Sequence, residues 1–213
     1  MGAWILLKTD RKMRETNLTL EQIETIITGY ADSPYYMGKN IVIPNCNWGF
    51  LNHEADLLVM TKAKRLIEVE IKRTWSDFLA DFKKAHTHED PKLGHLYYAV
   101  PLSIGERVFN YLYEGKYNCN RHALMYSHSE VTAYTEKNPN KCGLIVYAST
   151  EEIGWATMRV GVCCVNVLAQ KMNDYRVSTE EELKLLRLLG MRIWKLKKKL
   201  AEYQVETSLF KEK

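Results

Sequence analysis

The stretch from His53 to Lys72 reads HEADLLVMTKAKRLIEVEIK and decides the fold class of the chain. Its last seven residues alternate with the period of two that is typical of a β-strand, so that three aliphatic side chains face one way. Glu68, Glu70 and Lys72 face the other way. The predicted strand therefore has one apolar face and one largely charged face.

The pattern of residues 55–60 predicts a second strand. The five residues that follow do not continue its apolar pattern, which indicates a turn. We therefore expect an antiparallel hairpin. One register sets Met60 opposite Leu66. That register also places Asp56 opposite Glu70 on the same face, with the two backbones about 5 Å apart. A slip by one residue would move Asp56 to the other face of the sheet.

Two carboxylates and an ammonium group at one site are costly to remove from water unless they pair with one another or hold a cation. Asp56 and Glu70 offer oxygen ligands, which suit Mg²⁺ or Mn²⁺ better than Zn²⁺. A bound divalent ion stabilises charge on a phosphate, while Lys72 orients a water molecule or neutralises developing charge. The pattern thus favours metal-assisted phosphodiester hydrolysis. An ordinary amphipathic strand with its charged face in solvent gives the same alternation.

The order of these residues resembles the core motif of the PD-(D/E)xK nuclease superfamily, which has an acid on one strand and Glu-x-Lys on the next. Asp56 corresponds to the acid, and Glu70, Ile71 and Lys72 correspond to the second element. Ala55 stands where the name of the family has proline. The resemblance implies an α/β fold with a restriction-endonuclease-like core, in which a central mixed β-sheet is flanked by α-helices.

Segments further along the chain are similar to the bacterial MmcB-like group, which is associated with DNA repair. Residues 74–84 resemble the helix of that group, with its Asp-Phe, Asp and Lys, and residues 95–101 resemble its Tyr-Phe-Ala-Val-Pro strand. Residues 143–147 resemble the strand that comes next. These resemblances imply a divalent-metal-dependent nuclease that hydrolyses phosphodiester bonds of DNA, in DNA repair or processing.

The resemblance also implies roles for individual residues. Asp56, Glu70 and the backbone carbonyl of Ile71 would be the ligands of Mg²⁺ or Mn²⁺. Lys72 would be the catalytic lysine. The alternative is a catalytically inactive nuclease-like fold that acts as a DNA-binding or protein-interaction module, because an incomplete metal site would not support cleavage.

Accessory residues extend this set. An upstream helical glutamate often completes such sites, and of Glu21 and Glu24 we favour Glu24. Glu68 lies on the same strand face as the predicted metal ligand and would either join the site or be solvated. Asp81 and Lys84 lie on the next predicted helix, which in nuclease-like folds sends a polar side chain back to the metal. A solvated helix face with surface ion pairs explains both residues as well.

His86 and His88 flank Thr87 in a polar segment that also contains Glu89 and Asp90. This spacing suggests a second metal site. A His-x-His sequence in a polar loop is more often simply exposed.

The chain has 213 residues, of which 46% are hydrophobic, so it can bury a full core and a single domain is the default. We expect the nuclease-like core at about residues 17–165 and a C-terminal helix at about residues 179–206. We predict a cytoplasmic protein without membrane association, because no apolar run is long enough to span a bilayer and no signal peptide is indicated. The net charge of +4 is a mild bias toward polyanions and does not by itself indicate DNA binding.

Periodicity and capping residues predict the remaining elements. They are a helix that begins after Thr19 and ends at Gly29, an edge strand at residues 41–44, a helix over residues 75–86, a strand at residues 96–100, a helix at residues 105–114 and the last strands at residues 144–147 and 155–164. Residues 115–143 are either an insertion or contain short strands at residues 123–126 and 131–134.

The long C-terminal helix is expected to be capped at Thr179 and to have two distinct faces. The apolar face would pack on the domain or on a second copy in a homodimer, and it consists of Leu186, Leu189, Ile193, Trp194, Leu196 and Leu200. Lys195 and Lys199 share a different, basic face. This face would follow a DNA phosphate backbone, although cations near a helix C-terminus also complement the helix dipole.

Overall fold

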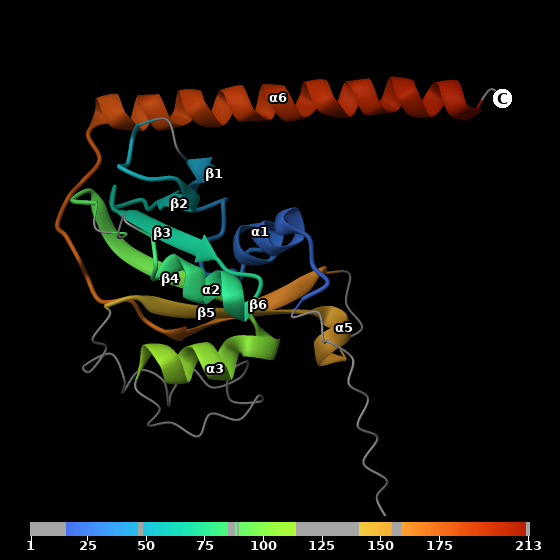
Figure 1. Cartoon of the computed structure of the whole chain (residues 1–213). Coiled ribbons are helices and arrows are strands. Elements are labelled where there is room, and N and C mark those ends of the chain that lie inside the picture. The colour runs from blue at the N-terminus through green and yellow to red at the C-terminus, as the bar shows by residue number, and fades with distance from the viewer. Residues whose placement is uncertain are drawn as a thin grey trace, which may run out of the picture.

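A computed structural model describes residues 16–46, 49–84, 88, 90–113, 141–154 and 159–211. They form an α/β fold around a six-stranded mixed sheet with strand order β1-β2-β3-β4-β5-β6 (Figure 1). The strands are β1 (Ile41–Cys46), β2 (Ala55–Met60), β3 (Leu66–Ile71), β4 (Leu93–Pro101), β5 (Gly143–Ser149) and β6 (Gly161–Val167). The helices are α1 (Leu20–Thr28), α2 (Trp75–Asp81), α3 (Leu102–Leu112), α5 (Thr150–Ile153) and α6 (Thr179–Lys211). The expected α/β class, with helices around a mixed sheet and a long C-terminal helix, is confirmed.

The centre of the sheet is parallel and its two sides are antiparallel. Strands β3, β4 and β5 run parallel, with α2 in the connection before β4 and α3 in the connection before β5. The other pairs, β1 with β2, β2 with β3 and β5 with β6, are antiparallel. The predicted hairpin therefore forms β2 and β3, and its register is confirmed because Met60 pairs with Leu66 and Leu58 pairs with Glu68.

One face of the sheet is covered by α1. Ile23, Ile26 and Ile27 of this helix are buried against the apolar side of the hairpin, including Val69 and Ile71. The N-terminal end of α1 follows the predicted capping box, in which Thr19 accepts from the Gln22 amide. The helix ends before Gly29, as predicted.

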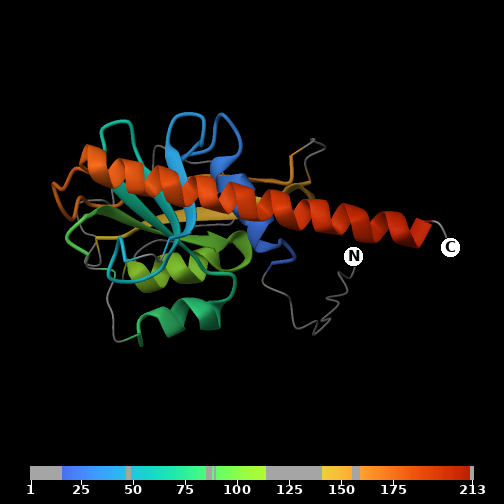
Figure 2. The same ribbon diagram turned by 90° about the horizontal axis from the view of Figure 1, so that it is seen from above.

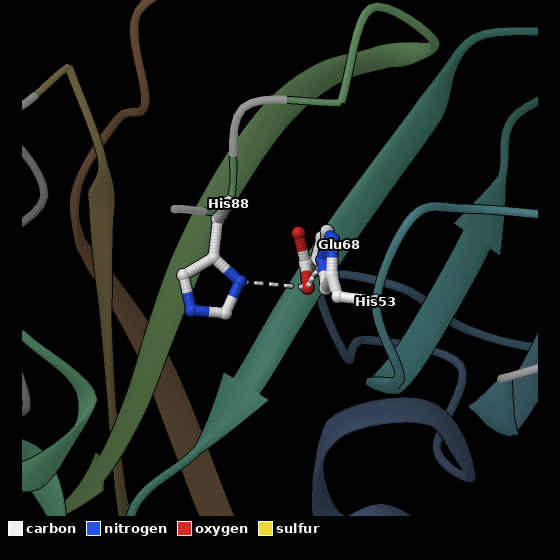
Figure 3. Close-up of side chains that lie close together, drawn as sticks. All are labelled: His53, Glu68 and His88. Carbon is white, nitrogen blue, oxygen red and sulfur yellow. Dashed lines mark hydrogen bonds and ion pairs between the residues drawn. The ribbon is translucent and has the colours of Figure 1, made fainter. Parts of the chain in front are cut away.

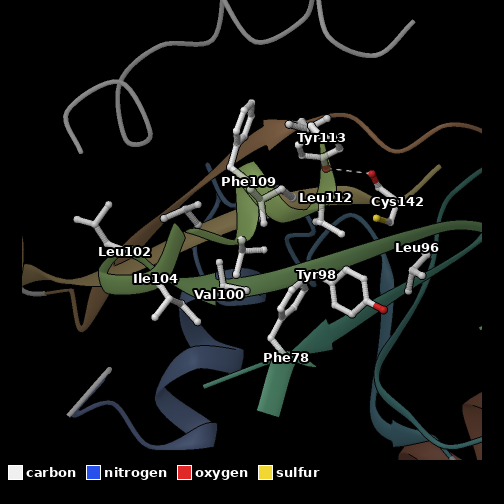
Figure 4. Close-up of a cluster of buried hydrophobic side chains, with 14 of the residues drawn as sticks. Phe78, Leu96, Tyr98, Val100, Leu102, Ile104, Phe109, Leu112, Tyr113 and Cys142 are labelled. Carbon is white, nitrogen blue, oxygen red and sulfur yellow. Dashed lines mark hydrogen bonds between the residues drawn. The ribbon is translucent and has the colours of Figure 1, made fainter. Parts of the chain in front are cut away.

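The opposite face of the sheet carries two apolar clusters with charged residues of β3 between them. The first cluster packs α2 and α3 on β4 and β5, with Phe78 and Phe109 among its largest members (Figure 4). The second packs the start of α6 on β1, β2 and the beginning of β3, through Leu185 and Leu188. Glu68 lies between these two clusters and is fully buried.

Helix α2 is shorter than the predicted helix at residues 75–86, because it ends at Asp81. Phe82, which falls inside the predicted helix, follows α2 and is exposed. His86, at the end of the predicted helix, lies outside the described residues, as do the proposed strands at residues 123–126 and 131–134. The edge strand β1 also differs from expectation, since it continues through Pro44 to Cys46. An edge position tolerates proline because one side of the strand forms no ladder.

Helix α6 crosses the β1 side of the sheet and extends beyond the rest of the domain (Figures 1 and 2). Its first turn is capped by Ser178, whose hydroxyl accepts from the Glu181 amide, and not by Thr179 as predicted. Most of the predicted apolar face does not pack on the domain. The members that are exposed are Leu186, Ile193, Trp194, Leu196 and Leu200, whereas Leu189 packs partly on the core. Within the described part of the chain, no helix has the length and apolarity needed to span a membrane.

Replacement of Leu112 by Ala tests the cluster under α3. Leu112 is fully buried, and truncation leaves a cavity, so we expect the free energy of unfolding to fall by about 2–5 kcal/mol in urea denaturation. Glu106→Ala on the exposed side of the same helix should change it by less than about 0.5 kcal/mol. Equal effects of the two substitutions would contradict the burial of Leu112 in the cluster under α3.

Candidate functional site

The residues predicted to bind metal line one pocket. Asp56, Glu70, Ile71 and Lys72 surround a space of about 450 Å³, and the other lining residues are Asn52, His53, Glu54, Asp77 and Lys84. The pocket lies where the hairpin of β2 and β3 meets the start of α2. The predicted convergence of two acids and a lysine is therefore present.

The hairpin holds the two acids by direct hydrogen bonds. The Ile71 amide donates to Oδ2 of Asp56 at 2.8 Å, and the Asp56 amide donates to Oε1 of Glu70 at 3.4 Å. Each carboxylate is therefore oriented by the backbone of the other strand. Ile71 belongs to the apolar cluster under α1 and is also one of the residues that line the pocket.

The Glu70 carboxylate resists ionisation. Burial and the charge of Asp56 raise the pKa of Glu70 to about 7, although the Lys72 ammonium acts in the opposite direction. Burial also raises the pKa of Asp56 above its usual value, even though the Ile71 amide and Lys72 favour the ionised form. A cation between Asp56 and Glu70 would stabilise the ionised form of both carboxylates.

Lys72 is buried and held by two carboxylates. Its Nζ donates to Oε2 of Glu70 at 2.8 Å and to Oδ1 of Asp81 at 2.9 Å. Burial alone would lower the pKa of Lys72, but the two acids outweigh it and hold the pKa above its usual value. The ammonium is therefore charged and fixed in one position.

Asp81 lies at the end of α2 and is the centre of an ion-pair network. Besides Lys72, it accepts from Lys84 at 2.6 Å, from Nε2 of His88 at 2.7 Å and from the Tyr98 hydroxyl at 3.0 Å. Burial would raise the pKa of Asp81, but hydrogen bonds from His88, Lys72 and Lys84 hold it far below the usual range. The interpretation that Asp81 lies on a solvated helix face is wrong, because its side chain is fully buried.

The network continues to Glu68, which has histidines on two sides (Figure 3). Oε1 of Glu68 lies 3.0 Å from Nδ1 of His88 and 2.6 Å from Nε2 of His53. Burial would raise the pKa of Glu68, but the hydrogen bonds with His53 and His88 lower it. Glu68 is therefore an internal, ionised residue and not a solvated one.

His88 bridges the two acids of the network. Its Nδ1 faces Glu68 and its Nε2 faces Asp81, and although burial lowers its pKa, these two partners raise the pKa to about 10. The expectation that this histidine is exposed in a polar loop is wrong. Sequence spacing gave a signal for His88 but none for His53, because its partner Glu68 is distant in the chain.

The upstream glutamates occupy different environments. Glu24 is half-buried, and burial together with the charges of Glu21 and Asp56 raises its pKa to about 7. Glu21 is exposed, and hydrogen bonds at the start of α1, including one with Thr19, lower its pKa. The charge of Asp56 raises the pKa of Glu24, but Glu24 lines the groove between α1 and α6 and is not among the residues that line the pocket of Asp56, so its role at the metal site stays a prediction.

The basic residues predicted for DNA binding lie elsewhere. Lys195 and Lys199 line a groove between α1 and α6, with a volume of about 640 Å³. Glu21 and Glu24 line the same groove, so its charge is mixed and not uniformly basic. DNA contact by the two lysines stays a prediction.

No protein-family model matches this chain, and no curated protein matches it. Among solved structures, it is similar to a protein of unknown function from Silicibacter pomeroyi, with a TM-score of 0.46 and 10% sequence identity. That similarity covers 87% of this chain and 94% of the other.

The alkaline stability of the metal-free protein tests the position of His88. A pKa raised from 6.5 to about 10 means that protonated His88 stabilises the fold fully below about pH 6.5, and that this stabilisation is lost as the pH rises toward 10. Because a tenfold change in proton affinity corresponds to about 1.4 kcal/mol, the difference between wild type and His88→Gln in EDTA should shrink by at least about 1 kcal/mol between pH 6.5 and 10.

The control is His95→Gln on β4. Burial lowers the pKa of His95, so its contribution to stability changes on the acid side and leaves the alkaline range unaffected. A constant difference between wild type and His88→Gln from pH 6.5 to 10, measured by urea denaturation, would contradict the network.

Proposed function

We propose that this protein is a divalent-metal-dependent nuclease that hydrolyses phosphodiester bonds of DNA, with Mg²⁺ or Mn²⁺ as the cofactor. A role in DNA repair or processing is part of the proposal, as is a place in the PD-(D/E)xK superfamily with a restriction-endonuclease-like core. The observation that carries it is the convergence of Asp56, Glu70, Ile71 and Lys72 on one pocket. Their order along the chain and their arrangement on two paired strands agree with the motif.

The donor set of this pocket fits a hard divalent cation. Asp56 and Glu70 offer carboxylate oxygens, and Ile71 offers a backbone carbonyl, which are the ligand types that Mg²⁺ and Mn²⁺ prefer. Burial is the main cause of the raised pKa values of both acids, and the charge of Asp56 raises the pKa of Glu70 further, although the Lys72 ammonium acts in the opposite direction. Bound Mg²⁺ would supply Lewis-acid stabilisation of a phosphate oxygen and a water of lowered pKa.

The residues of the chain would contribute positioning and fixed charge. Lys72, held between Glu70 and Asp81, presents an ammonium to the pocket where negative charge develops on a phosphate. Lys84 lines the same pocket and is partly exposed, so it would contact the DNA backbone at the edge. Glu24 would hold water or complete the ligand set from α1.

The rival proposal is a nuclease-like module that binds DNA or a protein without cleaving it. One observation favours it, because both hydrogen bonds of Lys72 go to carboxylates, and these would compete with a substrate phosphate. Metal binding at Glu70 would weaken one of the two. Cleavage assays therefore separate the two proposals.

The deciding experiment is cleavage of single-stranded, duplex and branched DNA with Mg²⁺ or Mn²⁺, with an EDTA control. Wild type should cut at least one substrate, and Asp56→Asn should lower the rate more than about 100-fold, because the loss of a metal ligand costs more than the loss of an outer partner. Asp174→Asn is the matched control. Its carboxylate is exposed and pairs with Lys171 and Arg65 at the surface, so its rate should stay within about threefold of wild type.

Folding of each variant is checked by circular dichroism before rates are compared. Asp56→Asn is preferred to a Lys72 variant, since Lys72 is buried and its loss would leave Glu70 and Asp81 without their shared cation. Equal cleavage by wild type and Asp56→Asn would defeat the nuclease assignment. If wild type cleaves none of the substrates, the result would favour the DNA-binding or protein-binding module.

We also propose that α6 mediates a homodimer. Beyond the part anchored by Leu185 and Leu188, the helix exposes large apolar side chains, with Trp194 at 70% and Leu196 at 65% exposure. An exposed apolar stripe of this kind is typical of an interface. A second copy of the helix offers the same stripe, so an isologous contact between two helices would cover both.

Light scattering coupled to size exclusion tests this contact. Wild type should have the mass of two chains at micromolar concentration, and Trp194→Glu should be monomeric, because the substitution places a charge in the centre of the apolar contact. Lys62→Glu, at an exposed site in the turn between β2 and β3, should stay dimeric. A monomeric wild type would rule out the dimer.

A further inference from the structure

Behind the pocket, three segments of the chain bring together two histidines and a carboxylate. His53 comes from the connection between β1 and β2, Glu68 from β3, and His88 from the connection between α2 and β4 (Figure 3). One ligand atom from each lies within 4.8 Å of the other two. All three side chains are nearly or fully buried, with exposures of 1%, 0% and 9%.

The two imidazole rings are oriented as they are in protein metal sites. The inner nitrogens, Nε2 of His53 and Nδ1 of His88, both face Oε1 of Glu68. The outer nitrogens each meet an oxygen, because Nδ1 of His53 lies 2.6 Å from Oδ1 of Asn52 and Nε2 of His88 lies 2.7 Å from Oδ2 of Asp81. Metal-binding histidines commonly donate their second ring proton to such an oxygen, which fixes the tautomer and the ring plane.

Glu68 supplies a second, independent observation. Its Oε2 is buried and has no hydrogen-bond partner among the described residues. A buried carboxylate oxygen without a partner costs free energy, whereas a metal ion that binds Glu68 through either or both oxygens would offset this cost. The orphaned oxygen therefore points to a ligand at this position.

We propose that His53, Glu68 and His88 form a zinc site that lies next to the pocket of Asp56 and Glu70 and uses neither of these acids as a ligand. Two imidazole nitrogens and one carboxylate are ligands that Zn²⁺ accepts in tetrahedral sites, with water as the fourth ligand. Mg²⁺ prefers oxygen ligands and is a poor match to a pair of imidazoles.

The present separations of 2.6 and 3.0 Å are hydrogen-bond distances. Ligands placed 2.0–2.1 Å from a tetrahedral zinc ion lie about 3.4 Å apart, so binding would spread the three groups by roughly half an ångström. The proton that His88 shares with Glu68 would leave when zinc binds. The bond of His88 to Asp81 would stay, since it uses the other nitrogen.

A second group of ligand atoms, from Glu70, Asp81 and His88, is less suited to a metal. The ammonium of Lys72 already pairs with both acids of that group. A metal ion there would have to displace a buried cation. Among the described residues, Glu68 forms its hydrogen bonds with His53 and His88 and pairs with no lysine or arginine, so zinc there would displace only a proton.

Zinc at Glu68 would have a structural role. It would join two connections to the central strand β3, and through His88 it would fix the position of Asp81, which holds Lys72. The proposal does not rest on nuclease activity, because its ligands differ from the acids of the pocket. A protein that cleaves nothing would still bind zinc.

The test uses the full chain, purified without a histidine tag, stripped of metal and loaded with Zn²⁺. Elemental analysis after gel filtration should give one zinc per chain for wild type and for Asp56→Asn. Glu68→Gln and His88→Gln should retain less than about a tenth of this amount, because each loses a ligand. His95→Gln, at a histidine outside the site, should bind zinc like wild type.

Two further readouts keep the test decisive where a variant fails to fold. Zn²⁺ should raise the melting temperature of metal-free wild type but not that of Glu68→Gln. Co²⁺ in place of zinc should give the intense visible bands of a tetrahedral nitrogen and oxygen site in wild type. No zinc uptake by wild type, weak octahedral bands for cobalt, or zinc retention equal to wild type in a folded Glu68→Gln variant would each overturn the proposal.

Discussion

The burial of ionised groups beneath α2 is the constraint on which the rest of the structure depends. Charged side chains cannot leave water unless each finds a partner, and here the partners form one connected chain from Glu70 through Lys72, Asp81 and His88 to Glu68. The sheet places these residues between two apolar clusters, which exclude water from both sides. Helix α2 ends at Asp81, and the Asp81 carboxylate meets the ring of His88.

The pairing of Asp56 with Glu70 could be predicted from the sequence. Alternation on β3 and the polar turn before it determine the hairpin, and the hairpin determines that Asp56 meets Glu70. Such pairing is local, so period and register are sufficient to derive it. The first helix was equally accessible, because Thr19 and Gly29 mark its ends by capping chemistry.

The inner part of the network was not predictable in this way. Helix periodicity indicates only which residues share a face of the same helix, so the sequence made Asp81 look solvated, whereas its partner Lys72 directly follows β3 and its partner Tyr98 lies on β4. Helix periodicity is insufficient for α6 too. Its apolar residues form a broad stripe, but Leu185 and Leu188 are the ones that are buried in the core. In both cases tertiary contacts determine which residues are buried, and the spacing of residues along the sequence does not indicate these contacts.

The parallel pairing of β3 with β4 has a consequence for the order in which the molecule assembles. The β2–β3 hairpin closes through a short turn, so its strands, with Asp56 and Glu70, can pair early. Strand β4 reaches β3 only after α2 and the segment that carries His88 have crossed the sheet. In a partly folded chain, Lys72 could already pair with Glu70, but Glu68 would lack His88. His88 comes shortly before β4 in the chain, so completion of the sheet and completion of the ionic network are coupled.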